Sequence, residues 1–345
     1  MKLPQYFVGI DISAESFTVS ISSKPGVGLY EAKDFNNDPE GFDRLTAWFK
    51  VLKMKVCDMI ICMEATGVYG ELLCYYLYEH KYRIAVDQPL KVKRAFKITG
   101  HKTDAVDSLQ IAEYAIRFFD SLNIWEPRSA LVEKLKAMIT IRELLVKHRT
   151  AEKNIRSTIR RKKVVPEGAI AVLESGIKTL SSNITTIEKA MYELIDSQPR
   201  MRQIVDILKT GPGVQELLAA NVLVLTNGFT KEKTGKQLAS YLRLAPLKYE
   251  SGTSVYKRPR SPKYGPAIPR KLLHLAARSI TTHNPKFRKY YLQKQIEGKD
   301  NYLIYNNVAN KILKIMCAMI RDQKPYLDEY VSINPKYLNY GLQRS

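Results

Sequence analysis

Four carboxylates in the first third of the chain have the residue type and the spacing of a metal site. Asp11 and Glu64 each stand at the end of an apolar run, and Asp104 and Asp107 lie three residues apart at the start of a helical pattern. Carboxylate oxygens, without His or Cys, are the ligands that Mg²⁺ or Mn²⁺ prefers. Two such ions can activate the attacking oxygen and stabilise the leaving oxygen at a phosphodiester. The sequence therefore predicts metal-dependent phosphodiester chemistry, provided that the fold gathers these acids.

Each acid also has a simpler structural explanation. An Asp at the end of a strand can accept hydrogen bonds from nearby backbone N–H groups, as Asp11 would in a capped turn. Acidic residues favour the first turn of a helix by less than about 1 kcal/mol, which would account for Asp104 and Asp107. A common location for all four acids favours the metal site, since four carboxylates at one point repel one another unless cations lie among them.

The elements that carry these acids follow the order expected of an RNase H-like domain. Apolar runs and alternating patterns predict three strands, a helix, a strand, a helix, a strand and a final helix. In this fold the ends of the first and fourth strands meet the last helix, which would bring the four acids together. We expect an α/β domain with a mixed five-stranded sheet, whose strands cover residues 6–12, 17–21, 28–35, 57–64 and 82–87.

The composition indicates a globular chain that binds a polyanion. The 345 residues suggest about two domains, and 55 Lys and Arg against 34 Asp and Glu give a net charge of +21. Such an excess favours nucleic acid over an anionic membrane, and the longest apolar runs are too short to span a bilayer. The four cysteines form no C-x-x-C pair, so neither a disulfide framework nor a zinc site is expected, and a reducing cytoplasm fits.

Long helices with basic faces are predicted from about Arg128. Apolar residues recur about every 3.5 positions from Leu131 to Leu145, and a second helical pattern runs from Ile177 to Ile195, which indicates an antiparallel helical pair. Between residues 128 and 163, twelve Lys or Arg oppose three Glu. The run ends in Arg160, Arg161, Lys162 and Lys163, and this favours phosphate contact over a merely solvated face.

Two stretches in the C-terminal part also point to nucleic acid. Gly211 and Gly213 flank Pro212 between two predicted helices, as in a helix-hairpin-helix turn whose glycines let a phosphate approach; a plain helix–helix turn is the alternative. Residues 247–265 look irregular and strongly basic, with tyrosines among the charges, which is typical of a nucleic-acid channel. The candidate contacts there and just beyond are Lys257, Arg258, Arg260, Lys263 and Arg270.

Several motifs together resemble one family. The N-terminal part contains YFVGIDIS, MEATGVYGELL and GHKTDAVDSLQIAEYA, and the C-terminal part contains LKTGPGVQELLAANVLV, KQLASYLRLAP, ESGTS and GPAIPRKLLHLAA. As a set they are similar to the DEDD transposases of the insertion-sequence family that includes the Piv DNA invertase. Recently recognised members of that family are recombinases guided by a bridge RNA. The resemblance covers nearly the whole chain.

The resemblance implies specific roles for residues. Asp11, Glu64, Asp104 and Asp107 match the metal-binding tetrad, and Ser251, in a Ser-Gly context, matches the nucleophilic serine. Without the family, Ser251 reads as a turn residue before Gly252. The chain departs from the family pattern around RSPKYGPAIPRK, where prolines are numerous, and Ser254 and Ser261 are alternative nucleophiles.

The resemblance also implies partners and a domain division. The expected partners are donor and target DNA, a non-coding bridge RNA and further copies of the chain, in a prokaryotic cytoplasm and away from membranes. We expect a RuvC-like catalytic domain in residues 1–125, a helical pair in 126–200 and a mainly α transposase domain in 201–345.

Three other functions compete with recombination. A RuvC-like junction resolvase or nuclease would hydrolyse DNA with the same metal site and no serine intermediate. An actin-like ATPase or sugar kinase shares the strand-turn-strand opening, but it needs a Gly-rich phosphate turn where this chain has Ile12-Ser13-Ala14. A non-catalytic nucleic-acid binder would be indifferent to the loss of Glu64.

Overall fold

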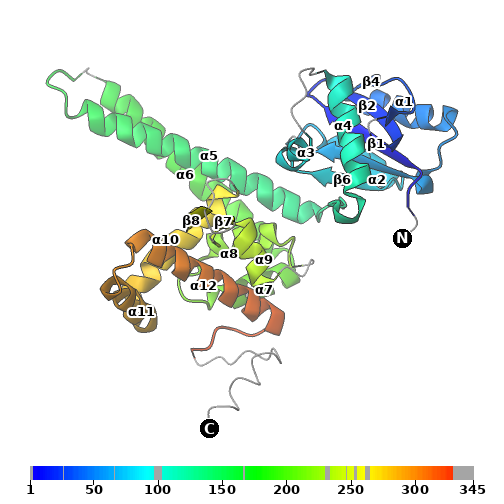
Figure 1. Cartoon of the computed structure of the whole chain (residues 1–345). Coiled ribbons are helices and arrows are strands. Elements are labelled where there is room, and N and C mark those ends of the chain that lie inside the picture. Colours follow the sequence, from blue (N-terminus) through cyan, green and yellow to red (C-terminus); the bar gives the residue numbers. More distant parts are fainter. Residues whose placement is uncertain are drawn as a thin grey trace, which may run out of the picture. The chain divides into compact units, whose positions relative to one another are not determined.

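The computed structural model (Figure 1) describes residues 3–25, 27–65, 67–96, 103–165, 168–229, 234–245, 247–251, 255–260 and 265–328. The chain forms two compact units, Met1–Pro127 and Arg128–Ser345. Each unit has its own apolar core. Within the described residues, no helix combines the length and the apolar character needed to cross a membrane.

A mixed sheet forms the centre of the N-terminal unit. Its main path has the order β3-β2-β1-β5-β6, and β4 also pairs with β2. Strand β1 is antiparallel to β2 and parallel to β5, which is in turn parallel to β6. The strands are β1 (Tyr6–Ile12), β2 (Ser16–Lys24), β3 (Val27–Gly28), β4 (Lys33–Asn36), β5 (Met59–Glu64) and β6 (Ile84–Asp87). The predicted mixed sheet is therefore confirmed.

The predicted count of five strands is wrong, because the expected strand 28–35 is two short strands. Strand β3 pairs with one end of β2 and β4 with the other, so both lie on the same edge. Between them the chain bends away from the sheet, and Leu29 and Tyr30 are exposed. Alternation alone did not reveal this break, since it continues across the bend.

Helices cover both faces of this sheet. One face buries Val8, Ile10 and Ile12 against α1 (Pro39–Val51) and α2 (Glu71–Glu79). The opposite face carries Phe7 and Ile60 and packs against α3 (Pro89–Ala95) and α4 (Asp104–Arg117). Short 3₁₀ turns at Val56–Asp58 and Phe119–Ser121 lead into β5 and out of α4. Successive side chains of β1 thus point to opposite faces of the sheet, so the position of a polar residue along the strand determines the face on which it lies.

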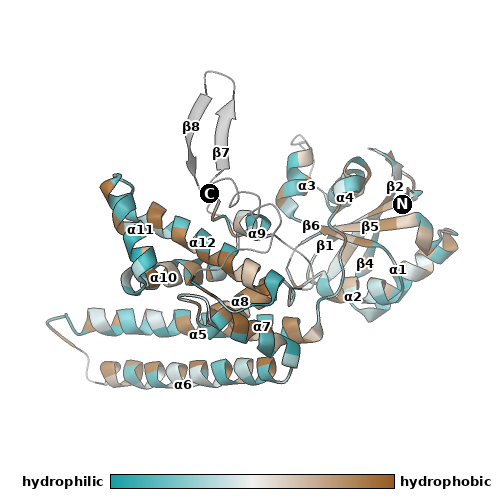
Figure 2. Ribbon diagram, turned by 90° about the horizontal axis from the view of Figure 1, so that it is seen from below, coloured by the Kyte–Doolittle hydropathy of each residue, from teal (hydrophilic) through white to brown (hydrophobic). Residues whose placement is uncertain are grey.

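Two long helices open the C-terminal unit. Helices α5 (Ala130–Ile159) and α6 (Ala169–Asp196) run side by side in both views (Figures 1 and 2). They are antiparallel, because Arg142, Arg149 and Arg160 bond to successively earlier residues of α6, namely Glu188, Ser181 and Glu174. The proximal ends of both helices, with Leu135 and Ile195, belong to the core of this unit.

The rest of the C-terminal unit is mainly helical. Its elements are α7 (Pro199–Lys209), α8 (Glu216–Leu225), α9 (Gly235–Tyr241), α10 (Ala267–His283), α11 (Pro285–Ile296) and α12 (Asn301–Asp322). Helix α8 is apolar along most of its length and lies in the core, as its brown colour shows (Figure 2).

The expectation of an irregular stretch at residues 247–265 is wrong in part. Strands β7 (Leu247–Ser251) and β8 (Val255–Arg260) pair antiparallel in a separate two-stranded sheet. Val255 and Tyr256 are strand-forming residues, but the surrounding Lys, Arg and Pro obscured their pattern.

Candidate active site

Two of the predicted acids end adjacent parallel strands. The register of β1 and β5 runs to the pair Ile10 and Met63, and Asp11 and Glu64 are the next residues along the two strands. Both are half-buried. Asp11 alternates with Gly9, and Glu64 with Cys62, so both lie on the face that α4 covers. The carboxyl ends of parallel strands are the usual position of sites in such sheets.

Helix α4 approaches β1 closely because residue 9 is glycine. A Cβ atom on Gly9 would lie 2.0 Å from the Ser108 carbonyl oxygen and 2.3 Å from the Ala112 nitrogen. The Ser108 and Ser20 hydroxyls, 2.7 Å apart, join the helix to β2 beside this contact. No side chain fits between the helix and the strand at this point.

The direction of α4 carries its acids toward Asp11. Farther along the helix, Ile111 and Tyr114 pack in the cluster that contains Phe7, at the opposite end of β1. The start of α4 therefore lies toward the carboxyl end of β1. Thr103 caps the helix by accepting from the Val106 N–H, and Asp104 is exposed whereas Asp107 is half-buried.

Asp11 and Glu64 share a face and an edge of the sheet, and the start of α4, which carries Asp104 and Asp107, lies toward that edge. Among the described residues, no group of three or more His, Cys, Asp and Glu side chains could hold a metal ion. The donor chemistry fits Mg²⁺ or Mn²⁺, since all four side chains supply carboxylate oxygens. The contact at Gly9 also fits, because a side chain there would displace the helix that carries two of the acids.

A fifth acid on the same face was not predicted as a site residue. Asp87 ends β6, pairs with Glu64 in the strand register and is 2% exposed. Its carboxylate accepts from the Lys91 ammonium at 2.8 Å and from the Asn123 N–H at 3.3 Å. The sequence did hold a signal, because residues 82–87 form a third apolar strand that ends in a carboxylate.

The charge of Asp87 raises the pKa of two neighbouring side chains, Tyr114 and Cys62. Burial, followed by the Asp87 charge, raises the pKa of the Tyr114 hydroxyl to about 12. Burial also raises the pKa of the Cys62 thiol, and the Asp87 and Glu64 charges raise it further. Cys62 is therefore an inert core thiol. Because both charges raise its pKa, Asp87 and Glu64 both lie close enough to Cys62 to interact with it electrostatically.

The predicted nucleophile lies in the β7–β8 hairpin. The Ser251 backbone ends β7 and pairs with Val255. The alternatives Ser254 and Ser261 lie outside the described residues. Among the predicted nucleic-acid contacts, Lys257, Arg258 and Arg260 belong to β8, Arg270 is half-buried in the first turn of α10, and Lys263 lies outside the described residues.

The basic run after α5 is exposed. Arg160 is the C-terminal cap of α5, and its guanidinium lies 2.5 Å from a Glu174 oxygen on α6. Arg161, Lys162 and Lys163 follow it and are exposed. Cationic side chains in such a position can contact phosphates.

The Gly-Pro-Gly turn packs against the interior of the unit. Gly213 has φ +73°, and a Cβ atom on it would lie 2.4 Å from Ile280 Cγ2 on α10. Gly211 is buried, and a Cβ atom on it would lie 3.1 Å from the Leu208 carbonyl oxygen and 3.2 Å from Val214 Cγ2. Packing against α10 therefore requires a glycine at position 213, whereas the close contacts of Gly211 are local to the turn and the end of α7.

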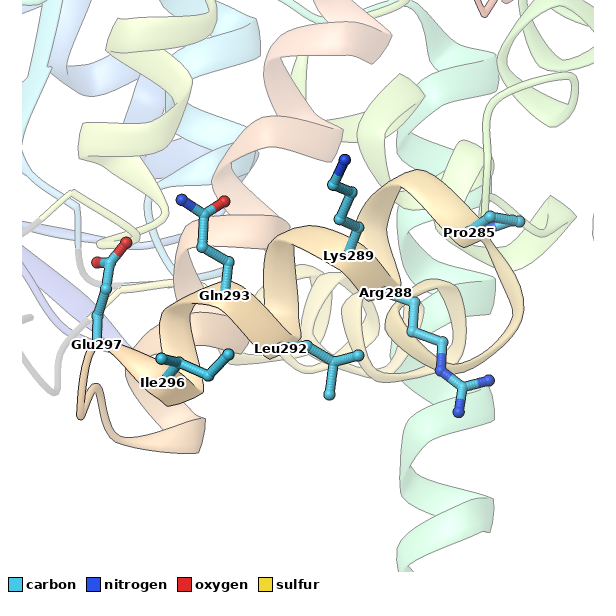
Figure 3. A pocket seen from close by; sticks show the side chains of 7 residues that line it. All are labelled: Pro285, Arg288, Lys289, Leu292, Gln293, Ile296 and Glu297. Atoms are coloured by element: carbon cyan, nitrogen blue, oxygen red, sulfur yellow. The ribbon is translucent and has the colours of Figure 1, made fainter.

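A hollow on α11 contains none of the predicted site residues. Figure 3 shows its lining on this helix, with Leu292, Ile296 and the Arg288 side chain toward the same side. The lining residues are Pro285, Arg288, Lys289, Leu292, Gln293, Ile296 and Glu297.

The mixed sheet, the helix across its central strand and the acids at the ends of β1 and β5 define an RNase H-like domain. Comparison with protein families gives the particular group. Residues 8–160 match the DEDD transposase family and residues 205–292 match the "Transposase IS116/IS110/IS902 family". Together these matches cover well over half of the chain. The protein belongs to this family of insertion-sequence transposases.

Individual relatives agree with the family assignment. The chain is 26% identical over 327 residues to the "Pilin gene-inverting protein" of Moraxella lacunata, covering 93% of this chain and 97% of the relative. The protein of that name from Moraxella bovis matches to the same extent. The "Insertion element IS110 uncharacterized 43.6 kDa protein" of Streptomyces coelicolor is 28% identical over 162 residues, covering 46% of this chain and 39% of the relative. The predicted link to the Piv invertase group is therefore confirmed.

Proposed function

We propose that this transposase recombines DNA with divalent metal ions held by Asp11, Glu64, Asp104 and Asp107, and with Ser251 as the nucleophile. The observation that carries the proposal is the placement of Asp11 and Glu64 at adjacent strand ends, under a helix that begins with the other two acids. Mg²⁺ or Mn²⁺ bound there would polarise the phosphodiester and stabilise the leaving oxygen.

The serine would conserve the energy of the broken bond. The Ser251 oxygen bonds to phosphorus while a deoxyribose oxygen leaves and takes up a proton. In the second step the hydroxyl of another DNA strand attacks the same phosphorus, and the serine oxygen leaves and is protonated again. A phosphodiester is broken and a phosphodiester is formed, so no external energy source is needed.

The basic C-terminal unit would hold the nucleic acids. Lys257, Arg258 and Arg260 lie on β8, the strand that pairs with the one ending in Ser251, and Arg160 to Lys163 follow the end of α5. We include Lys263 and Arg270 among the contacts, but not the turn at Gly211 and Gly213, because it packs toward the interior of the unit. The partners proposed are donor and target DNA and a bridge RNA, with several copies of the chain in the complex.

Recombination of element-bearing plasmids tests the catalytic roles. Replacing the acids by amides (Asp11→Asn, Glu64→Gln) or removing the hydroxyl (Ser251→Ala) is expected to lower recombination at least about 100-fold, since each removes a group that acts in the chemical step. Glu40→Gln and Ser279→Ala are matched controls, because both residues are exposed and neither is among the proposed groups. Wild-type recombination by the Asp11 and Ser251 variants would refute the proposal.

Trapping the intermediate separates recombination from hydrolysis. A covalent adduct between DNA and Ser251 is expected in the wild type and absent from Ser251→Ala. Nicked DNA without an adduct would instead support the junction resolvase or nuclease. For the RNA partner, sequencing of co-purified RNA should give one species encoded beside the gene, whereas random cellular RNA would contradict guidance.

A further inference from the structure

Asp87 lies where it could compete with Glu64 for a cation. The two residues are register partners at the ends of β5 and β6, so their side chains leave the same face of the sheet. Hard cations bind any carboxylate of suitable geometry. A carboxylate that was available beside Glu64 would therefore add both negative charge and an alternative ligand.

The structure holds the Asp87 carboxylate with several donors at once. One oxygen accepts from Lys91 Nζ at 2.8 Å, and the other accepts from the Asn123 N–H at 3.3 Å. The raised pKa of Tyr114 reflects a hydrogen bond to Asp87 in addition to burial and charge. Asp87, at the end of β6, is thus engaged from α3, α4 and the segment that follows α4.

Lys91 neutralises the charge of Asp87, although much of the lysine side chain lies at the surface. Its side chain is 53% exposed, whereas the Asp87 side chain is 2% exposed. Pro89 starts α3, and buried Val92 fixes the helix against the sheet, which sets the reach of Lys91 back to Asp87. An exposed ion pair contributes little, but the loss of the cation beside a buried carboxylate leaves an uncompensated charge.

We propose that Lys91 and Asp87 form a positioning pair that keeps the Asp87 carboxylate out of the metal coordination, so that of these two paired acids Glu64 is the ligand. This inference rests on the proposed metal-dependent function. Neither Asp87 nor Lys91 is a catalytic residue in this scheme. Their role is to determine how many carboxylates can coordinate the cation and at which positions.

Mn²⁺ binding to the full-length protein, measured by titration calorimetry, tests the pair. In Lys91→Met the released Asp87 charge is expected to tighten Mn²⁺ binding about tenfold or more, because a unit charge a few ångströms from the ion adds strong attraction in a partly buried site. Recombination should fall in the same variant, since the ion is drawn toward Asp87. Lys91→Arg keeps the charge and should retain wild-type Mn²⁺ affinity.

The double variant Lys91→Met with Asp87→Asn is the decisive control. It removes both charges and should restore wild-type Mn²⁺ affinity, and it remains informative if the single variant fails to fold. A tenfold loss of affinity in the double variant would make Asp87 a ligand and overturn the inference. So would unchanged Mn²⁺ affinity in a folded Lys91→Met protein. If the wild type binds no Mn²⁺, the proposed metal-dependent function fails first, and the inference fails with it.

Discussion

At the scale of single residues, Gly9 has the sharpest requirement in the N-terminal unit. Gly9→Ala would place a methyl group against backbone atoms of α4, and neither the helix nor the strand can move without disturbing the core. We expect a loss of about 3 kcal/mol in the free energy of unfolding, at the upper end of overpacking effects. Urea unfolding measures it, and Gly28→Ala, whose Cβ would meet nothing closer than 3.4 Å, is the control. Equal stability of the two variants would contradict the argument.

His274 gives a pH-dependent prediction for the C-terminal unit. Burial, together with the nearby Arg270 charge, lowers the pKa of His274 below its ordinary value of 6.5. Below that value the unfolded chain binds a proton that the folded chain does not, so the free energy of unfolding falls as the pH decreases toward the folded pKa. His274→Gln should remove this part of the slope when urea unfolding is compared between about pH 5 and 7. An unchanged slope would assign the pH dependence to other groups.

The sequence indicated the positions of some candidate residues more clearly than those of others. The location of Asp11 and Glu64 at strand ends could be predicted because each follows an apolar run that is typical of a buried strand. Asp87 follows a similar run, but an Asp before Gln-Pro also fits an ordinary turn, and only its burial and its bond to Lys91 distinguish it. The need for glycine at position 9 depends on a helix that begins 95 residues later, which local patterns do not contain.

At the scale of elements, a partly buried ion cluster joins the long helices. Arg142 on α5 lies 2.6 Å from Glu143 and 2.8 Å from Glu188 on α6, and the three side chains are 15%, 16% and 29% exposed. Lys271 on α10 also reaches Glu143, at 3.3 Å. Removal of the guanidinium would take a cation from both carboxylates, of which Glu143 would keep Lys271.

Arg142→Ala is therefore expected to lower the free energy of unfolding by about 2 kcal/mol, below the cost for a fully buried pair because some solvent reaches the cluster. Lys189→Ala is the matched control, since Lys189 is 78% exposed and lies 3.7 Å from Glu193. That control should cost less than about 0.5 kcal/mol. Similar values for both variants would show that the cluster adds nothing.

Some helices and strands could be predicted from their sequence patterns more reliably than others. The apolar spacing of the two long helices is regular over many turns and has few competing interpretations. The β7–β8 hairpin is short. Its many charged residues indicated nucleic-acid binding, but they obscured the alternation of residues that would have indicated two strands. The break between β3 and β4 was also hidden, because pairing to the two ends of β2 is a property of the sheet rather than of either segment.

At the scale of the whole molecule, the positive charge belongs to one unit. Residues 1–127 contain 15 Lys and Arg against 17 Asp and Glu, whereas residues 128–345 contain 40 against 17. Nucleic-acid affinity should therefore come from the C-terminal unit, and it should depend steeply on salt.

Replacing Arg161, Lys162 and Lys163 by Gln should reduce the salt slope of DNA binding, by up to about 0.9 for each phosphate that the protein no longer neutralises. The slope is measured as the change of log affinity with log salt concentration. The same change at Lys24, Lys50 and Lys55, which are exposed residues of the N-terminal unit, should leave it unaltered. An equal effect of both triple variants would place the phosphate-binding residues elsewhere.

The length of the helical pair formed by α5 and α6 can change without a change in the apolar cores of the two units. At 1.5 Å per residue, the 30 residues of α5 measure about 45 Å, which is the rise of about 13 base pairs of duplex. Matched deletion of a heptad from both helices would keep their apolar seam in phase and shorten the arm by about 10 Å. The length of the helical pair can therefore change without any change in the residues of the mixed sheet.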